Sequence, residues 1–321
     1  MTISLSIRFW LLLVPLIPSL IVTIFNLYHF LCNRALRVAL NNHVIIILLF
    51  YGLVEEITDI SWQIHFYRTG NILSSTPAFC LTYVFVGPYL TTSLKVLMGW
   101  ALIERHILVF HRNCIATQKK RILFHYFPLF MCMIWPMIFY FVIFIILPCN
   151  IPFDYNIYQC NRYGCLLGDP TIQLVDSIVN YIMSPFIIVI FSVTLLARVL
   201  YHRHRINQRI DWRNYRKMIV QLISLSFLYL VFQLPQGIMY VAYSTGLSRS
   251  IGSSYYSDAL FLIYYVTLLT PFVTVMSLPD LQTKCRNTIL FWQRRRLVPP
   301  EMLIMTRRKT SQTDALTPVT L

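Results

Sequence analysis

Seven long apolar stretches divide this chain of 321 residues, and they constrain its fold more than any other feature. Each stretch is long enough for a helix to cross a hydrocarbon core of about 30 Å. Only helices and closed barrels satisfy their own backbone hydrogen bonds in lipid, and the sequence lacks the alternating segments of a barrel. We therefore predict an all-α membrane protein, a seven-transmembrane helix bundle. The expected spans are 9–33, 43–67, 79–104, 122–148, 174–200, 217–245 and 257–278.

Basic residues predict how the bundle is oriented. One face of the predicted membrane carries 22 of the 27 Lys and Arg residues, and such an excess marks the cytoplasmic side. We therefore expect an outer amino terminus, a cytoplasmic carboxyl terminus and a location in the plasma membrane. The net charge of +15 follows from this topology and from anionic inner-leaflet lipid, so we expect no nucleic-acid partner.

Four cysteines fall on the predicted outer side, where disulfides persist. Two bridges are expected, and the sequence does not choose among three connectivities. We favour one bridge from the start of the third span to the loop before the fifth, and a second that closes a small loop. The favoured pairs are Cys80 with Cys165 and Cys149 with Cys160.

The third span joins this outer cysteine to a charged pair at its inner end. Arg105 follows Glu104 and lies 25 residues after Cys80, a helical distance of roughly 37 Å that is enough to cross the membrane. Glu104 beside Arg105 is expected to form a local ion pair. The alternative is an ordinary basic residue at the interface, with its stem extended toward the headgroups.

These residues resemble the rhodopsin-like (class A) G protein-coupled receptors, in particular divergent invertebrate chemoreceptor-like members. The resemblance covers nearly the whole chain. Glu104, Arg105 and His106 match the Asp/Glu-Arg-Tyr motif, and Cys80 has the expected spacing before it. Asn26 matches the asparagine of the first helix, and Trp135 matches the tryptophan of the fourth. The helix-bend prolines of the fifth, sixth and seventh helices are matched by Pro185, Pro235 and Pro271.

The chain departs from this family inside the bundle. Gly52 stands at the position of a sodium-coordinating aspartate, and Gln233 replaces the toggle tryptophan of the sixth helix. The seventh helix reads Thr270-Pro271-Phe-Val-Thr274 where Asn-Pro-x-x-Tyr is usual, and Val193 replaces a tyrosine of the fifth.

The resemblance implies a receptor that couples an unidentified extracellular small-molecule or peptide ligand to heterotrimeric G proteins. Glu104, Arg105 and His106 would be its coupling switch. It also implies an eighth helix, and residues 279–297 have apolar residues near helical spacing that suit an amphipathic helix on membrane lipid. Residues 298–321 are expected to be a disordered cytoplasmic tail, in which Thr310 and Ser311 are candidate sites for a kinase that recruits an arrestin.

The ligand site is the least constrained part of this prediction. Gly87 stands where amine receptors of the family have an aspartate, and the seventh span has no lysine for a retinal Schiff base. Ionisable groups within a membrane are functional candidates, and Glu55 and Asp59 could meet a cationic ligand or Lys95; the alternative is a structural network within the bundle. The pocket candidates are Glu55, Asp59, Tyr83, Gly87, Thr91, Gln233, Tyr240 and Tyr264.

Other classes of function are weighed against the receptor. The chain contains no His-Glu-x-x-His, Gly-x-Ser-x-Gly or phosphate-binding glycine motif, so we expect no enzyme, cofactor or metal site. A transporter or ion channel is the main alternative, with Glu55, Glu56, Asp59 and Lys95 as pathway charges, although the repeats of many transporters are not detected. A receptor-like protein that binds ligand without signalling is the third.

Overall fold

The structure, a computed structural model, describes residues 3–110, 116–147, 154–157, 160, 170–205 and 212–277. Within these residues the regular elements are helices and no strand is present. Residues 1–277 form one compact unit, and residues 278–321 form a second that lies outside the described part. The predicted eighth helix, the tail, Thr310 and Ser311 are therefore outside the described residues.

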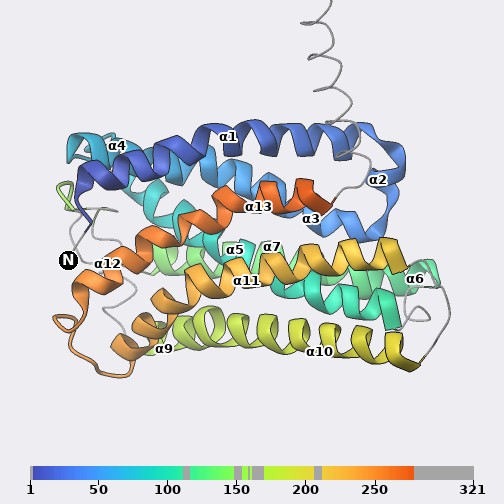
Figure 1. Cartoon of the computed structure of the whole chain (residues 1–321). Helices are drawn as coiled ribbons and strands as arrows, with labels where there is room; N and C mark the ends of the chain where they lie inside the picture. Colours follow the sequence, from blue (N-terminus) through green and yellow to red (C-terminus); the bar gives the residue numbers. More distant parts are fainter. Residues whose placement is uncertain are drawn as a thin grey trace, which may run out of the picture. The chain divides into compact units, whose positions relative to one another are not determined.

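The long helices run alongside one another (Figure 1). In chain order the helices are α1 (Leu5–Cys32), α2 (Arg34–Val38), α3 (Leu40–Glu55), η1 (Glu56–Ile60), α4 (Ser61–Thr69), α5 (Pro77–Phe110), α6 (Gln118–Arg121), η3 (Ile122–Tyr126), α7 (Phe127–Phe141), η4 (Val142–Ile146), α9 (Pro170–Asp176), η6 (Ser177–Met183), α10 (Ser184–Arg205), α11 (Trp212–Ser244), α12 (Ser253–Leu262) and α13 (Tyr264–Ser277).

Six of the helices in the described part are long and apolar enough to cross a membrane. They have 23 to 32 residues, so even the shortest extends about 35 Å at 1.5 Å per residue. This confirms the prediction of an all-α protein with multiple membrane helices. The six are Leu5–Cys32, Pro77–Leu108, Gln118–Ile146, Thr171–Arg198, Gln221–Ser244 and Ser253–Val275.

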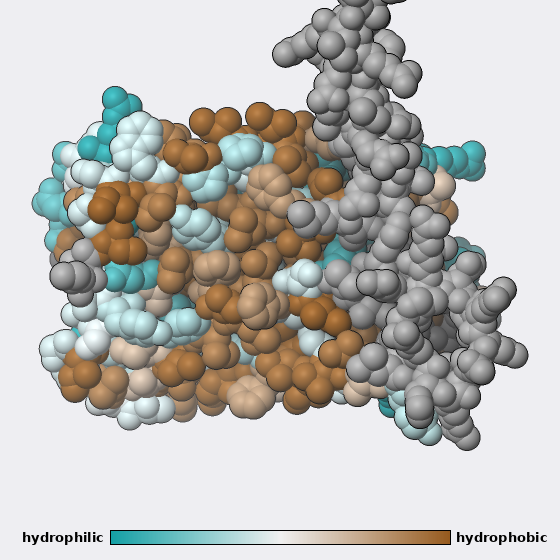
Figure 2. All heavy atoms as spheres, viewed as in Figure 1, coloured by the Kyte–Doolittle hydropathy of each residue, from teal (hydrophilic) through white to brown (hydrophobic). Residues whose placement is uncertain are grey.

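The outer surface of the unit is apolar and part of its interior is polar. On α1, Trp10 and Val14 are 60% and 61% exposed, whereas Ser19, Thr23 and Asn26 are buried. Such an inverted pattern is expected where lipid, rather than water, surrounds a helix. Figure 2 shows hydrophobic residues over the middle of the visible helices and hydrophilic residues gathered at the end that carries α4.

α5 is the central helix of the unit. It packs against α3, α7, α10 and α11. In its most apolar stretch of 18 residues, 61% of the residues are buried, the largest share among the six membrane-length helices. Its packing explains why α5 continues to Phe110, beyond the expected end at residue 104: the polar side chains there are buried among neighbouring helices.

Four π-helical turns interrupt the described helices: η1, η3, η4 and η6. A π turn inserts one extra residue and is frequent at functional sites. η1 carries Glu56 and Asp59, η3 carries His125, and η6 carries Asn180, so three of the four bring a buried polar side chain into the interior. Of the predicted helix-bend prolines, Pro235 and Pro271 lie inside α11 and α13, and Pro185 follows η6 at the start of α10.

Candidate functional site

A disulfide holds the first turn of α5. Cys80 is bonded to Cys160, with the Cα atoms 5.8 Å apart, and both residues are buried. The predicted pairs of Cys80 with Cys165 and of Cys149 with Cys160 are therefore wrong, because Cys80 and Cys160 bond to each other. Cys149 and Cys165 lie outside the described residues. Sequence spacing did not distinguish these pairings, since a bridge depends on which Cα atoms the fold brings within about 7 Å.

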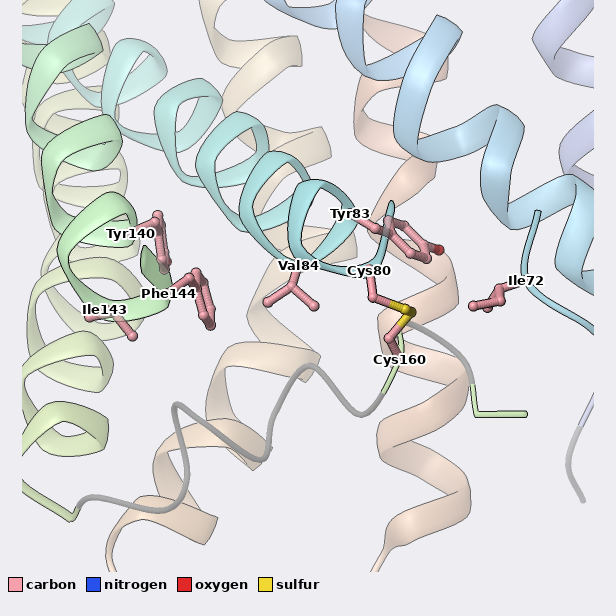
Figure 3. Packing of buried hydrophobic residues seen from close by; sticks show 8 residues of the cluster. All are labelled: Ile72, Cys80, Tyr83, Val84, Tyr140, Ile143, Phe144 and Cys160. Atoms are coloured by element: carbon pink, nitrogen blue, oxygen red, sulfur yellow. A yellow bond between two sulfur atoms is a disulfide. The ribbon is translucent and has the colours of Figure 1, made fainter. Parts of the chain in front are cut away.

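Apolar side chains surround this disulfide. Figure 3 shows the sulfur atoms beside Tyr83 and Ile72, with Val84 on the same helix and Tyr140 and Phe144 on the neighbouring one. The Tyr83 ring packs edge-on against Trp62, with 5.2 Å between ring centroids. Tyr83, a predicted pocket residue, thus lies in the hydrophobic core beside the disulfide.

The opposite end of α5 carries the predicted switch. Glu104, Arg105 and His106 are 1%, 3% and 9% exposed. The Glu104 carboxylate accepts a hydrogen bond from Nδ1 of the His125 ring on η3, an ion pair when that ring is protonated. Sequence analysis had paired Glu104 with Arg105 and did not identify His125, which sits in an apolar segment 21 residues away.

His125 continues into a hydrogen-bonded chain. Its Nε2 lies 2.9 Å from Nδ1 of His43 on α3, and Nε2 of His43 lies 2.9 Å from the backbone oxygen of Arg37 on α2. Four elements, α2, α3, η3 and α5, are thereby joined at the end of the unit that holds Arg105.

Carboxyl groups from η1 and the end of α3 occupy the interior midway along the bundle. Glu55, Glu56 and Asp59 are each at most 1% exposed. Thr267 and Thr91 donate hydrogen bonds to Glu55 over 2.5 Å and 3.2 Å, and Tyr264 donates to Asp59 over 3.1 Å.

Glu56 points toward α1. Its Oε1 accepts a hydrogen bond from Ser19, whose hydroxyl also lies 2.9 Å from the backbone oxygen of Leu268 on α13. The second oxygen, Oε2, is buried without a hydrogen-bond partner among the described residues. Glu56 also lines a small internal cavity, with room for about one water molecule, together with Thr23, Gly52, Leu94, Tyr229, Thr267 and Thr270.

A second buried carboxyl group, which sequence analysis missed, lies between α7, η6 and α11. Asp176 is 2% exposed and accepts hydrogen bonds from Tyr140 over 3.1 Å, Asn180 over 2.6 Å and Tyr240 over 2.7 Å. The only sequence signal was an acidic residue just before an uncharged stretch. Because its donors come from three separate segments, nothing local distinguished Asp176 from an exposed residue at a helix end.

Lys95 lies closer to this second group than the sequence suggested. Its ammonium group is 4.0 Å from the centroid of the Tyr181 ring, and the Tyr181 ring packs at a tilt against Tyr240 with centroids 4.3 Å apart. A cation over an aromatic face is attracted by the ring quadrupole. Lys95 thus has an aromatic contact with η6, and the contact with Glu55 or Asp59 stays a prediction.

The predicted pocket residues do not form one group. Glu55, Asp59, Thr91 and Tyr264 belong to the network on α3, η1, α5 and α13, whereas Tyr240 belongs to the Asp176 group. Gly87 and Gln233 are buried in α5 and α11.

The amino-terminal ends of α1 and α12 are joined by an ion pair that sequence analysis also missed. Arg8 donates hydrogen bonds to Asp258 over 2.5 Å and to Ser257 over 3.1 Å. The guanidinium lies 5.9 Å and 5.7 Å from the ring centroids of Tyr67 and Phe261.

Comparison of the chain with models of known protein families and with curated proteins finds no match.

Proposed function

We propose that this chain is a rhodopsin-like seven-helix receptor of the plasma membrane, which couples binding of an extracellular small-molecule or peptide ligand to heterotrimeric G proteins. The run α3, η1 and α4 continues from residue 40 to 69 without a loop. It would be the second crossing in chain order and would bring the total to seven. The basic residues support an outer amino terminus and a cytoplasmic carboxyl terminus.

The observation that carries the proposal is the arrangement of α5. This central helix is tethered at one end by the Cys80–Cys160 disulfide and presents the buried Glu104–Arg105 pair at the other. A buried guanidinium is costly to desolvate, and it is unusual unless a partner or a second conformation uses it. Asn26 supports the same reading, because its amide bonds to the Pro271 carbonyl oxygen and joins two positions that match the family.

In this mechanism the described conformation is the resting one. Ligand binding in the outer half of the bundle would favour a second conformation in which the inner part of α11 moves away from α5. The free energy by which a saturating ligand shifts this equilibrium equals the difference between its binding free energies for the two conformations. Arg105 would then offer its planar donor group to backbone carbonyl oxygens of a G protein. The eighth helix would lie on membrane lipid, and the tail would accept kinase phosphates and bind an arrestin.

The buried carboxyl groups support a role in switching between conformations. Glu55, Glu56 and Asp59 receive donors from α1, α5 and α13, so a shift of any of these helices exchanges hydrogen bonds within the interior. Such exchange gives a bundle two discrete arrangements.

The test is basal and ligand-stimulated G protein activation across a panel of α subunits, in cells with matched surface levels of each variant. Arg105→Ala is expected to abolish activation, and Arg105→Lys to retain little of it because the planar donor group is lost. Arg121→Ala is the matched control, since Arg121 is exposed on α6 near the same end. Equal activation by native protein and Arg105→Ala would contradict the proposal.

A second candidate, a transporter or ion channel, is favoured by three carboxyl groups that α3 and η1 bury in the interior of the unit. Ionisable residues at this depth often mark ion pathways. Glu55→Gln and Asp59→Asn separate the two functions: loss of a ligand-independent current would favour the channel, whereas altered ligand potency without current would favour the receptor. Ligand binding with neither current nor G protein activation would indicate a receptor that no longer signals.

A further inference from the structure

Hydrogen bonds run from Arg37 through His43 and His125 to Glu104. Their geometry determines how many hydrogens the nitrogens of the two imidazole rings must carry. The backbone oxygen of Arg37 accepts only, so Nε2 of His43 carries a hydrogen. The ionised Glu104 carboxylate accepts only, so Nδ1 of His125 carries one too. Two neutral imidazoles have no further N–H hydrogens to offer.

The middle contact nevertheless needs a hydrogen. Nδ1 of His43 and Nε2 of His125 are 2.9 Å apart, a distance at which two nitrogen lone pairs without a proton between them repel. No choice of neutral tautomers satisfies all three contacts while Glu104 is ionised. One ring must be an imidazolium, and its positive charge is offset by Glu104.

We propose that these hydrogen bonds form a pH-sensitive latch, in which one proton shared between His43 and His125 ties α2 and α3 to η3 and α5. When the proton is released, both rings become neutral, the middle hydrogen bond is lost and Glu104 remains a buried carboxylate. His43 is only partly buried, so the proton can exchange with solvent.

The charged and titratable groups near these contacts lie on α5, α7, η3 and α6, and among them the Arg105 guanidinium opposes a second positive charge. On α5, Arg105 lies close enough to Glu104 to interact electrostatically, and on α7 so does the Cys132 thiol. The Tyr126 ring packs against both imidazoles, with centroids 4.6 Å from His125 and 6.0 Å from His43. The basic residues of α6 are exposed: Lys119, Lys120 and Arg121.

The latch predicts how stability depends on pH. In the unfolded chain the two rings are apart and need no shared proton, whereas the folded chain needs one to complete the middle hydrogen bond. The folded state then binds more protons, so stability falls as pH rises, by up to about tenfold in the unfolding equilibrium per pH unit. The experiment measures thermal unfolding of the purified chain in detergent from about pH 7 to pH 9.

The substitution His43→Asn gives a matched variant. In His43→Asn, the amide nitrogen occupies the place of Nδ1 and donates its own N–H to His125, so no extra proton is needed. The fall in stability at alkaline pH should disappear. Glu104→Gln keeps an acceptor for His125 but removes the offsetting charge, so the fall should begin at lower pH.

Nitrogen-15 NMR of histidine-labelled native protein tests the shared proton directly and requires no variant to fold. One imidazolium signal at neutral pH, absent from His43→Asn, is expected. Two neutral rings at neutral pH, or a native unfolding temperature that does not fall toward pH 9, would overturn the proposal. Neither readout uses a G protein, so failure of the receptor function would leave this result unchanged.

Discussion

The side-chain amide of Asn26 on α1 donates a 2.9 Å hydrogen bond to the backbone oxygen of Pro271 on α13. Pro271 lies within its helix, and proline has no N–H with which to complete the preceding turn. Asn26 is fully buried, so the bond closes the contact between the first and last described helices without competition from water.

Asn26→Ala should destabilise the unit by about 1–3 kcal/mol, because a buried carbonyl loses its donor and a polar contact becomes a small void. Thermal unfolding in detergent measures the change. Asn71→Ala is the control, since Asn71 is exposed in the connection before α5 and should change little. Equal effects of the two substitutions would mean that the Asn26 contact contributes nothing specific.

Loss of the disulfide should cost about 2–5 kcal/mol, because Cys80 and Cys160 close a loop of 80 residues. Cys80→Ser and Cys160→Ser should have similar effects, and the double variant should be no worse than either. Cys32→Ser, at an exposed free thiol, is the control. Thiol labelling of the unfolded Cys80→Ser chain should newly modify Cys160. If Cys160 stays protected there, it is paired with another cysteine.

Tyr240→Phe should destabilise the unit by about 1–3 kcal/mol, because Asp176 loses one of its three donors inside the bundle. Tyr255→Phe removes the same hydroxyl from an exposed ring and should have almost no effect. A double-mutant cycle with Asp176→Asn isolates the pair. A coupling energy near zero would show that Tyr240 stabilises the fold through its ring alone.

Arg8→Lys should lower the unfolding temperature even though it preserves the charge. Lysine cannot reach Asp258 and Ser257 together, and it loses the flat contact with Tyr67 and Phe261. A loss of about 1–3 kcal/mol is expected from the buried hydrogen bonds. Arg68→Lys, at an exposed position on α4, is the comparison. If both lysine variants match the native protein, charge rather than geometry maintains the contact.

Much of the architecture could be predicted because hydropathy is a local property. Runs such as 9–33 and 122–148 exclude charged residues over a helix length, and the structure has membrane-length helices there. The second predicted span, 43–67, contains three acidic residues, and it lies within the run α3, η1 and α4, in which a π turn carries two of them. The spacing of Cys80 and Arg105 identified α5 as one helix for the same local reason.

The partners of the buried polar groups could not be read in this way. Glu104 was expected beside Arg105 because the two adjoin in sequence, whereas the contact with His125 depends on how η3 packs against α5. Asp176 looked like an ordinary residue at a helix end until helices from three segments surrounded it.

Hydropathy and helical rise act over neighbouring residues, so the sequence was sufficient to predict an all-α protein and the approximate positions of six membrane-length helices. The disulfide, the Asp176 group and the histidine contacts depend on distances between residues that lie as many as 82 positions apart in the sequence. Packing of the helices establishes those distances, because burial makes an unsatisfied polar group costly and so selects one set of partners. The Cys80–Cys160 bridge, the Asp176 group and the Glu104–His125–His43 chain are consequences of that packing.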